Sequence, residues 1–149
     1  MTKEEFIQIL KDDKGYSYKI ERNKIIVTHD GGVDLDSLKS IPPGVKFKNG
    51  GYVYLDSLKT IPPGVEFNNG GDVYLNFLET LPPGVEFNNG GDVYLDSLKI
   101  IPPDVHFNNG DDVNLESLTG DWFSDWKGNI EGIDKKRLLN VMIKRGVFL

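Results

Sequence analysis

The sequence contains no cysteine, so disulfide bonds and thiolate metal sites are excluded as supports for the fold. No stretch approaches the roughly 18 consecutive apolar residues that a membrane-spanning helix needs. The N-terminal residues carry charges at both ends of the segment and no small-residue cleavage site, so we expect no secretory signal. These absences predict a cytoplasmic protein with no membrane contact. Its 149 residues are enough to bury one continuous core.

Basic residues are scarce in the middle of the chain. Residues 31–120 carry 13 acids and five lysines, a net charge of −8, whereas residues 121–149 carry four acids and six bases, a net charge of +2. Binding to a nucleic-acid backbone requires a basic surface, so we expect no direct nucleic-acid contact. The acidic middle favours a protein partner with a basic surface. The alternative is that the charge only keeps the chain soluble.

A twenty-residue repeat fills the part of the chain between residues 25 and 120. Each copy combines a Val-x-Leu-x-x-Leu segment, a Pro-Pro pair, a Val-x-Phe segment and an Asn-Gly turn, with Asp or Gly following the turn. The most regular columns are Val33, Val53, Val73, Val93 and Val113; Leu35, Leu55, Leu75, Leu95 and Leu115; and Phe47, Phe67, Phe87 and Phe107. A fixed period of this length is typical of a solenoid, because one unit cannot enclose a core alone.

The repeat predicts a mainly β fold. Val-x-Phe and Val-x-Leu alternate as short half-buried strands do, and Pro-Pro marks a bend outside the paired strands. We expect the Asn-Gly-Gly segment to form a tight turn with positive φ angles. The prediction is a short β-solenoid of about five coils, with parallel strands stacked about 4.8 Å apart.

The chain is expected to form a single domain, residues 1–149, in three parts. Residues 1–24 form an N-terminal helical cap and a lead-in strand, residues 25–120 the repeats, and residues 121–149 a C-terminal cap. Thr2 and Glu5 make a capping box that opens a short helix to about Lys11. A second helix is expected from Asp134 to about Arg145.

Two segments of the repeat resemble known repeat proteins. "LKTIPPGVEF" resembles the Leu-x-x-Leu-Pro units of short bacterial leucine-rich repeats, and "FNNGGDVYLDSL" is similar to tandem repeats in phage and prophage proteins. The first resemblance implies protein binding. The second implies interference with a host protein, and therefore a location in the host cytoplasm.

The candidate binding residues face outward and fall into two rows and one irregular copy. Tyr54, Tyr74 and Tyr94 form one row; Asp56, Asn76 and Asp96 belong to the next. In the third copy Asn76, Phe77 and Glu79 replace the Asp, Ser and Lys of its neighbours. Tyrosine is enriched at interface hot spots, and a lone exposed Phe is a candidate anchor. The structural alternative for the tyrosine row is cross-strand aromatic pairing, and for Phe77 it is packing against its own neighbours. The acid row could mimic a phosphate ladder for a basic groove; its structural alternative is that solvent and lysines only screen the acids.

No pattern in the sequence indicates catalysis. It has no Walker loop, no Gly-x-Gly-x-x-Gly and no nucleophile set, and His29 and His106 lie about four coils apart, roughly 19 Å by strand spacing. We therefore expect neither an enzyme nor a cofactor or metal site. The predicted function is a non-catalytic protein-binding module, and the finer prediction is a phage-encoded inhibitor of a host defence or nucleic-acid-binding protein.

Two other functions stay open. One is a structural protein whose coils or caps self-associate, since the sequence leaves monomer and homodimer undecided. The other is calcium binding, because "NNGGD" resembles the Gly-Asp loops of calcium-binding β-rolls, although those loops repeat every nine residues or so.

Overall fold

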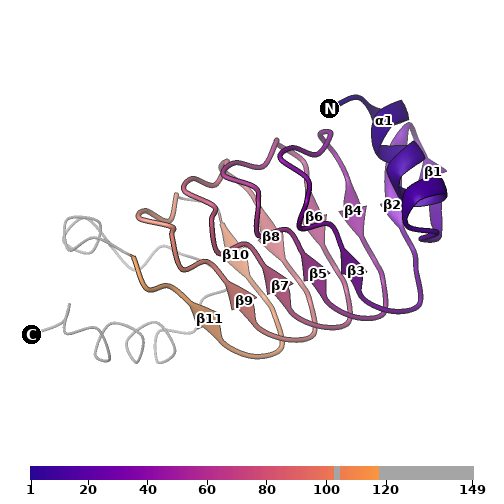
Figure 1. The fold of residues 1–149 in the computed structure, drawn as a ribbon. Helices are drawn as coiled ribbons and strands as arrows, with labels where there is room; N and C mark the ends of the chain where they lie inside the picture. The colour runs from indigo at the N-terminus through magenta and orange to yellow at the C-terminus, as the bar shows by residue number, and fades with distance from the viewer. Residues whose placement is uncertain (103–104, 118–149) are drawn as a thin grey trace, which may run out of the picture.

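The chain winds into a mainly β solenoid of about four parallel turns, preceded by one N-terminal helix (Figure 1). The computed structural model describes residues 1–102 and 105–117. The expected C-terminal cap at residues 121–149, with its helix from Asp134 to Arg145, lies outside the described residues. Within the described residues, no helix is both long enough and apolar enough to cross a membrane.

The N-terminal helix starts as its capping box predicts. Helix α1 (Lys3–Gln8) follows Thr2, whose hydroxyl accepts a hydrogen bond from the Glu5 backbone N–H while the Glu5 carboxylate accepts one from the Thr2 backbone N–H. A π-helical turn, η1 (Ile9–Asp13), continues it beyond the expected end at Lys11. Phe6 and Leu10 are fully buried in the core, so the helix covers the first coil.

A hairpin leads from the helix into the solenoid. Strands β1 (Tyr18–Glu21) and β2 (Lys24–Val27) pair antiparallel across a two-residue turn, in which Arg22 and Asn23 have φ angles of 51° and 64°. Two positive φ angles in a two-residue loop match the right-handed twist of the flanking strands. Strand β2 then pairs in parallel with β4 (Lys46–Phe47), with Ile26 beside Lys46 and Val27 beside Phe47.

The repeat strands form two sheets. The first sheet has the order β1-β2-β4-β6-β8-β10, and the second has the order β3-β5-β7-β9-β11. In the first sheet the repeat strands are β4 (Lys46–Phe47), β6 (Glu66–Phe67), β8 (Glu86–Phe87) and β10 (His106–Phe107). In the second they are β3 (Val33–Asp34), β5 (Val53–Tyr54), β7 (Val73–Tyr74), β9 (Val93–Tyr94) and β11 (Val113–Asn114).

The strands of neighbouring coils pair in a register that matches the twenty-residue period of the sequence. Val53 pairs with Val73, and Phe67 pairs with Phe87, so each strand residue lies beside its counterpart in the next copy. This confirms the predicted parallel stacking.

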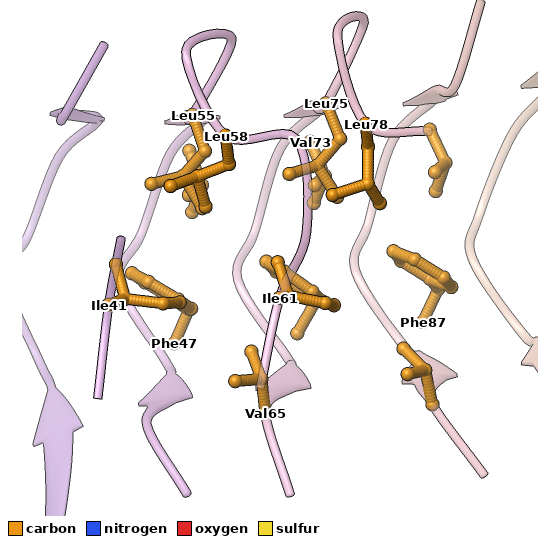
Figure 2. Packing of buried hydrophobic residues seen from close by; sticks show 14 of the residues in the cluster. Ile41, Phe47, Leu55, Leu58, Ile61, Val65, Val73, Leu75, Leu78 and Phe87 are labelled. Carbon is orange, nitrogen blue, oxygen red and sulfur yellow. The ribbon is translucent and has the colours of Figure 1, made fainter. Parts of the chain in front are cut away.

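The core is built from columns of identical side chains. Figure 2 shows two groups of side chains on opposite sides of the interior: Leu55, Leu58, Val73, Leu75 and Leu78 on one side, and Ile41, Phe47, Ile61, Val65 and Phe87 on the other. Successive Phe rings stack nearly parallel, with centroids 5.4, 5.2 and 5.1 Å apart. Among the described residues, every Val, Leu and Phe of the repeat columns is buried, because each coil covers the apolar edge of the one before it.

The Asn-Gly-Gly segment corrects one expectation. Its glycines have no positive φ; within the described repeats the positive φ angles fall on the glycines that follow Pro-Pro, at Gly44, Gly64 and Gly84. Gly70 is required for a different reason, since a Cβ atom there would lie 2.4 Å from the carbonyl oxygen of Gly50. Close approach between coils, rather than turn geometry, therefore selects glycine at this position.

The asparagines of the same segment form a buried column. Asn49, Asn69, Asn89 and Asn109 are nearly inaccessible to solvent. The Asn69 Nδ2 group donates to the carbonyl oxygen of Gly51 in the previous coil at 3.0 Å, and to those of Gly71 and Asp72 in its own coil at 3.2 Å. Each side chain thus fixes its own turn and joins it to the preceding coil.

Candidate binding face

The outward side of the second sheet gathers most of the predicted binding residues. Side chains alternate along each strand, so buried Val53 and Leu55 place Tyr54 and Asp56 outside. We call this side the tyrosine face. It consists of three columns: Tyr52, Asp72, Asp92 and Asp112; Asp34, Tyr54, Tyr74, Tyr94 and Asn114; and Asp36, Asp56, Asn76, Asp96 and Glu116. These positions hold eight carboxylates and no Lys, Arg or His.

Four tyrosine rings lie in contact on this face. The centroids of Tyr54 and Tyr74 are 4.4 Å apart in an edge-to-face arrangement, and those of Tyr74 and Tyr94 are 4.6 Å apart and stacked. Tyr52 extends the row, with its ring 4.3 Å from that of Tyr54 and 40% of its surface exposed. Sequence reasoning missed Tyr52, although its position two residues before Tyr54 places both side chains on one side of the strand.

Two of the tyrosines are held by hydrogen bonds to neighbouring carboxylates. The Tyr74 hydroxyl donates to Asp72 Oδ2 at 3.2 Å, and the Tyr94 hydroxyl donates to Asp92 Oδ2 at 3.1 Å. Burial raises the pKa of Tyr74 well above its ordinary value, and the charge and hydrogen bond of Asp72 raise it further. The pKa of Tyr94 is raised by burial and by its hydrogen bond to Asp92. Both rings are therefore neutral and fixed in orientation.

The carboxylate columns also join the coils. An aspartate oxygen accepts a hydrogen bond from the backbone N–H of the equivalent residue in the next copy, at distances of 2.7–2.9 Å. Four such bonds occur: Asp36 to Asp56, Asp56 to Asn76, Asp72 to Asp92, and Asp92 to Asp112. A charge-assisted bond to a backbone N–H offsets the repulsion between stacked acids, so the acidic rows have a structural role that the sequence did not reveal.

The third copy interrupts one of these columns. The Asn76 backbone N–H donates to Asp56 Oδ1, but Asn76 Oδ1 is buried and has no hydrogen-bond partner among the described residues. The buried Oδ1 of Asp96 also has no hydrogen-bond partner among the described residues. The pKa of Asp96 is raised by burial, and then by the nearby charges of Glu116 and Asp56. The uncharged Asn76 therefore interrupts the carboxylate column between Asp56 and Asp96.

Phe77 and Glu79 lie beside the tyrosine face rather than on it. Both occupy the corner around Leu78, whose N–H donates to the Leu75 carbonyl oxygen at 3.1 Å. Phe77 is 61% exposed, so packing against its own neighbours does not account for it. Sequence reasoning also missed Ile100, an exposed apolar side chain where the earlier copies have Ser or Thr.

One acidic cluster bears on the calcium alternative. Asp92, Asp111 and Asp112 each place a carboxylate oxygen within 4.8 Å of the others. Asp92 already accepts hydrogen bonds from the Tyr94 hydroxyl and the Asp112 backbone N–H. Asp111 and Asp112 are exposed to solvent. Exposed acids engaged in this way do not by themselves define a cation site, and we assign none.

The fold defines the class of the protein as a β-solenoid of about 20-residue repeats. No family model, curated protein or solved structure matches the chain. The resemblance to leucine-rich and phage-type repeats therefore identifies no family, and function has to be argued from the geometry of the surface.

Proposed function

We propose that the chain is a non-catalytic protein-binding module whose tyrosine face contacts a basic surface on a partner protein. The observation that carries this proposal is the column of Tyr54, Tyr74 and Tyr94 between two carboxylate columns, with Tyr52 in ring contact with Tyr54. Tyrosine offers a large contact area at a small loss of side-chain entropy, and hydrogen-bonded rings lose even less on binding. A Lys or Arg of the partner would be attracted both to the ring faces and to the carboxylates.

The spacing of the face suits a regular partner. Neighbouring ring centroids along the stack are 4.4 and 4.6 Å apart, one ring per coil. Residues three or four positions apart on one side of an α-helix are separated by about 5–6 Å. A basic helix lying along the stack would therefore present one cationic side chain to nearly every coil.

A finer proposal concerns the identity of the partner. The repeat resembles those of phage and prophage proteins, and residues 31–120 carry a net charge of −8. Host defence nucleases and other nucleic-acid-binding proteins have basic grooves for phosphate backbones. An acidic face would occupy such a groove and exclude its nucleic acid, so inhibition of a host protein is the function we propose.

The test is affinity purification from a bacterial lysate with the wild-type chain and three variants. Tyr74→Ala removes the centre of the tyrosine row, and Phe77→Ala tests whether the neighbouring corner belongs to the contact. Asn88→Ala, at an exposed residue directly after strand β8 of the first sheet, is the control. We expect one stoichiometric basic protein that is lost with Tyr74→Ala, retained with Asn88→Ala, and released by raised salt.

Two results would overturn the proposal. Equal capture by folded Tyr74→Ala and wild type would exclude the tyrosine face from the contact. Recovery of the bait alone, at low salt and high lysate concentration, would count against a partner in that host. Circular dichroism of each variant separates loss of binding from loss of fold.

A further inference from the structure

The outer strand of the N-terminal hairpin has an unpaired edge. Strand β1 ends the first sheet: it pairs with β2 on one side, and no described residue pairs with its other side. Lys19, Ile20 and Glu21 are exposed, Ile20 to 56%. A free edge presents backbone N–H and C=O groups that can pair with a strand of another chain.

The hairpin determines which backbone groups point outward. The Thr28 N–H donates to the Ser17 carbonyl oxygen at 2.9 Å, just beyond the pair formed by Tyr18 and Val27. Hydrogen-bonding direction alternates along an antiparallel strand. Ser17, Lys19 and Glu21 therefore bond toward β2, and Tyr18 and Ile20 direct their backbone groups to the free edge. An added antiparallel strand has to hydrogen-bond to these two residues.

The side chains of β1 favour a second copy of the same strand. If two β1 strands pair antiparallel about Ile20, the two Ile20 side chains face each other, and each Lys19 lies opposite Glu21 of the second copy. A register centred on Lys19 would instead place the two ammonium groups opposite each other, which is unfavourable. We propose that the chain forms a symmetric homodimer through β1, in the register centred on Ile20.

The ion pair already present does not oppose this arrangement. Lys19 Nζ lies 3.1 Å from Glu21 Oε2 of the same strand, and both side chains are largely exposed. A surface ion pair of this kind contributes little, so exchanging partners between copies costs little. The paired segment is short because positive φ angles at Arg22 and Asn23 end the strand. The dimer is therefore reversible and concentration-dependent.

The dimer has a consequence for the architecture. It joins two six-stranded sheets into one continuous sheet across the two-fold axis. The tyrosine face lies on the other sheet and stays accessible, so the dimer presents two copies of it. Dimerisation through β1 and partner binding by the tyrosine face can therefore be tested independently, and either can be refuted without the other.

Charge reversal on β1 provides the test, with sedimentation velocity of the full chain over a wide concentration range. In the Lys19→Glu dimer, acidic side chains lie opposite each other across the two-fold axis, and in the Glu21→Lys dimer, basic side chains do. Because two side-chain pairs are altered in each dimer, we expect the dissociation constant to rise about tenfold. The double variant restores opposite charges and wild-type association. A mixture of the two single variants pairs an acidic β1 strand with a basic one. We therefore expect a heterodimer at a protein concentration at which each variant alone is monomeric.

Three outcomes would overturn the proposal. The first is a wild-type chain that stays monomeric at the highest concentration reached. The second is a wild-type dimer that either single charge reversal leaves equally strong. The third is a mixture of single variants that does not associate. Circular dichroism controls for folding, and Ile20→Asp, which places two carboxylates on the axis, provides a second disrupting variant.

Discussion

Replacing Asn89 with alanine tests how much the buried asparagine column stabilises the solenoid. The Asn89 Nδ2 group donates to the carbonyl oxygens of Gly71 and Asp92, both at 3.0 Å, and to that of Gly91 at 3.4 Å. Each of these oxygens also accepts a backbone N–H, from Gly91, Val73 and Asp111 respectively. The substitution therefore removes hydrogen bonds without leaving a buried carbonyl group unpaired.

The magnitude follows from the two short bonds. Each contributes about 1 kcal/mol net, and the contact at 3.4 Å contributes little. Asn89 Oδ1 is buried without a partner among the described residues, which is unfavourable in the folded state. Removing this oxygen therefore offsets part of the stability lost with the two hydrogen bonds. We expect Asn89→Ala to lower the free energy of unfolding by about 1–2 kcal/mol. The neighbouring Asn88→Ala, at an exposed position, should change it by less than about 0.5 kcal/mol.

Urea unfolding followed by circular dichroism measures both values under the same conditions. The informative quantity is the difference between the two variants, because the chemical change is identical and the residues are adjacent. If Asn89→Ala is no less stable than Asn88→Ala, the three-carbonyl contact is not a source of stability. An equal and large loss in both variants would show instead that the whole turn is sensitive to its exposed side chains.

Two further predictions follow from the same coils. Gly70→Ala should destabilise the fold by more than about 2 kcal/mol in urea unfolding, because its Cβ atom would lie 2.4 Å from the Gly50 carbonyl oxygen; an unchanged midpoint would refute the close approach. The raised pKa of Tyr74 favours the neutral phenol in the folded state, so its stabilisation is complete below the unfolded-state pKa of about 10.0 and is lost as pH rises through the folded-state pKa. Ultraviolet titration of the folded protein should show late ionisation of Tyr74 and Tyr94, and fewer late-ionising tyrosines in Tyr74→Phe; simultaneous ionisation of all tyrosines near pH 10.0 would contradict this.

The fold could be predicted from the sequence because the repeat determines the strand register directly. When copies are twenty residues apart and nearly identical, parallel pairing aligns Val53 with Val73 and Phe67 with Phe87, and a one-residue shift would turn apolar side chains outward. The capping box at Thr2 was equally decisive, since both of its hydrogen bonds are local. Local patterns and a strict period are the signals that a sequence carries best.

The role of the Asn-Gly-Gly glycines could not be predicted in this way. Asn-Gly is a strong local signal for a turn with positive φ, yet Gly70 has no positive φ and is needed because Gly50 of the preceding coil comes close. The positive φ falls on Gly64, after the Pro-Pro pair. Glycine is selected both by a turn with positive φ and by a close contact between residues twenty positions apart. The sequence alone therefore cannot show which of the two requires the glycine.

The candidate face shows a similar division between what the sequence predicts and what only coordinates reveal. The tyrosine row could be predicted as a column of the repeat, but the structural role of Asp56 could not. The sequence shows only that carboxylates are stacked, whereas the stabilising contact is between the Asp56 carboxylate and the backbone N–H of Asn76. Residues with a structural bond cannot be altered freely to change a partner. Specificity that leaves stability intact has to come from exposed positions where one copy departs from the others. Tyr52, which replaces an aspartate, and Phe77, which replaces a serine, meet both conditions, so substitutions there should separate binding from folding most cleanly.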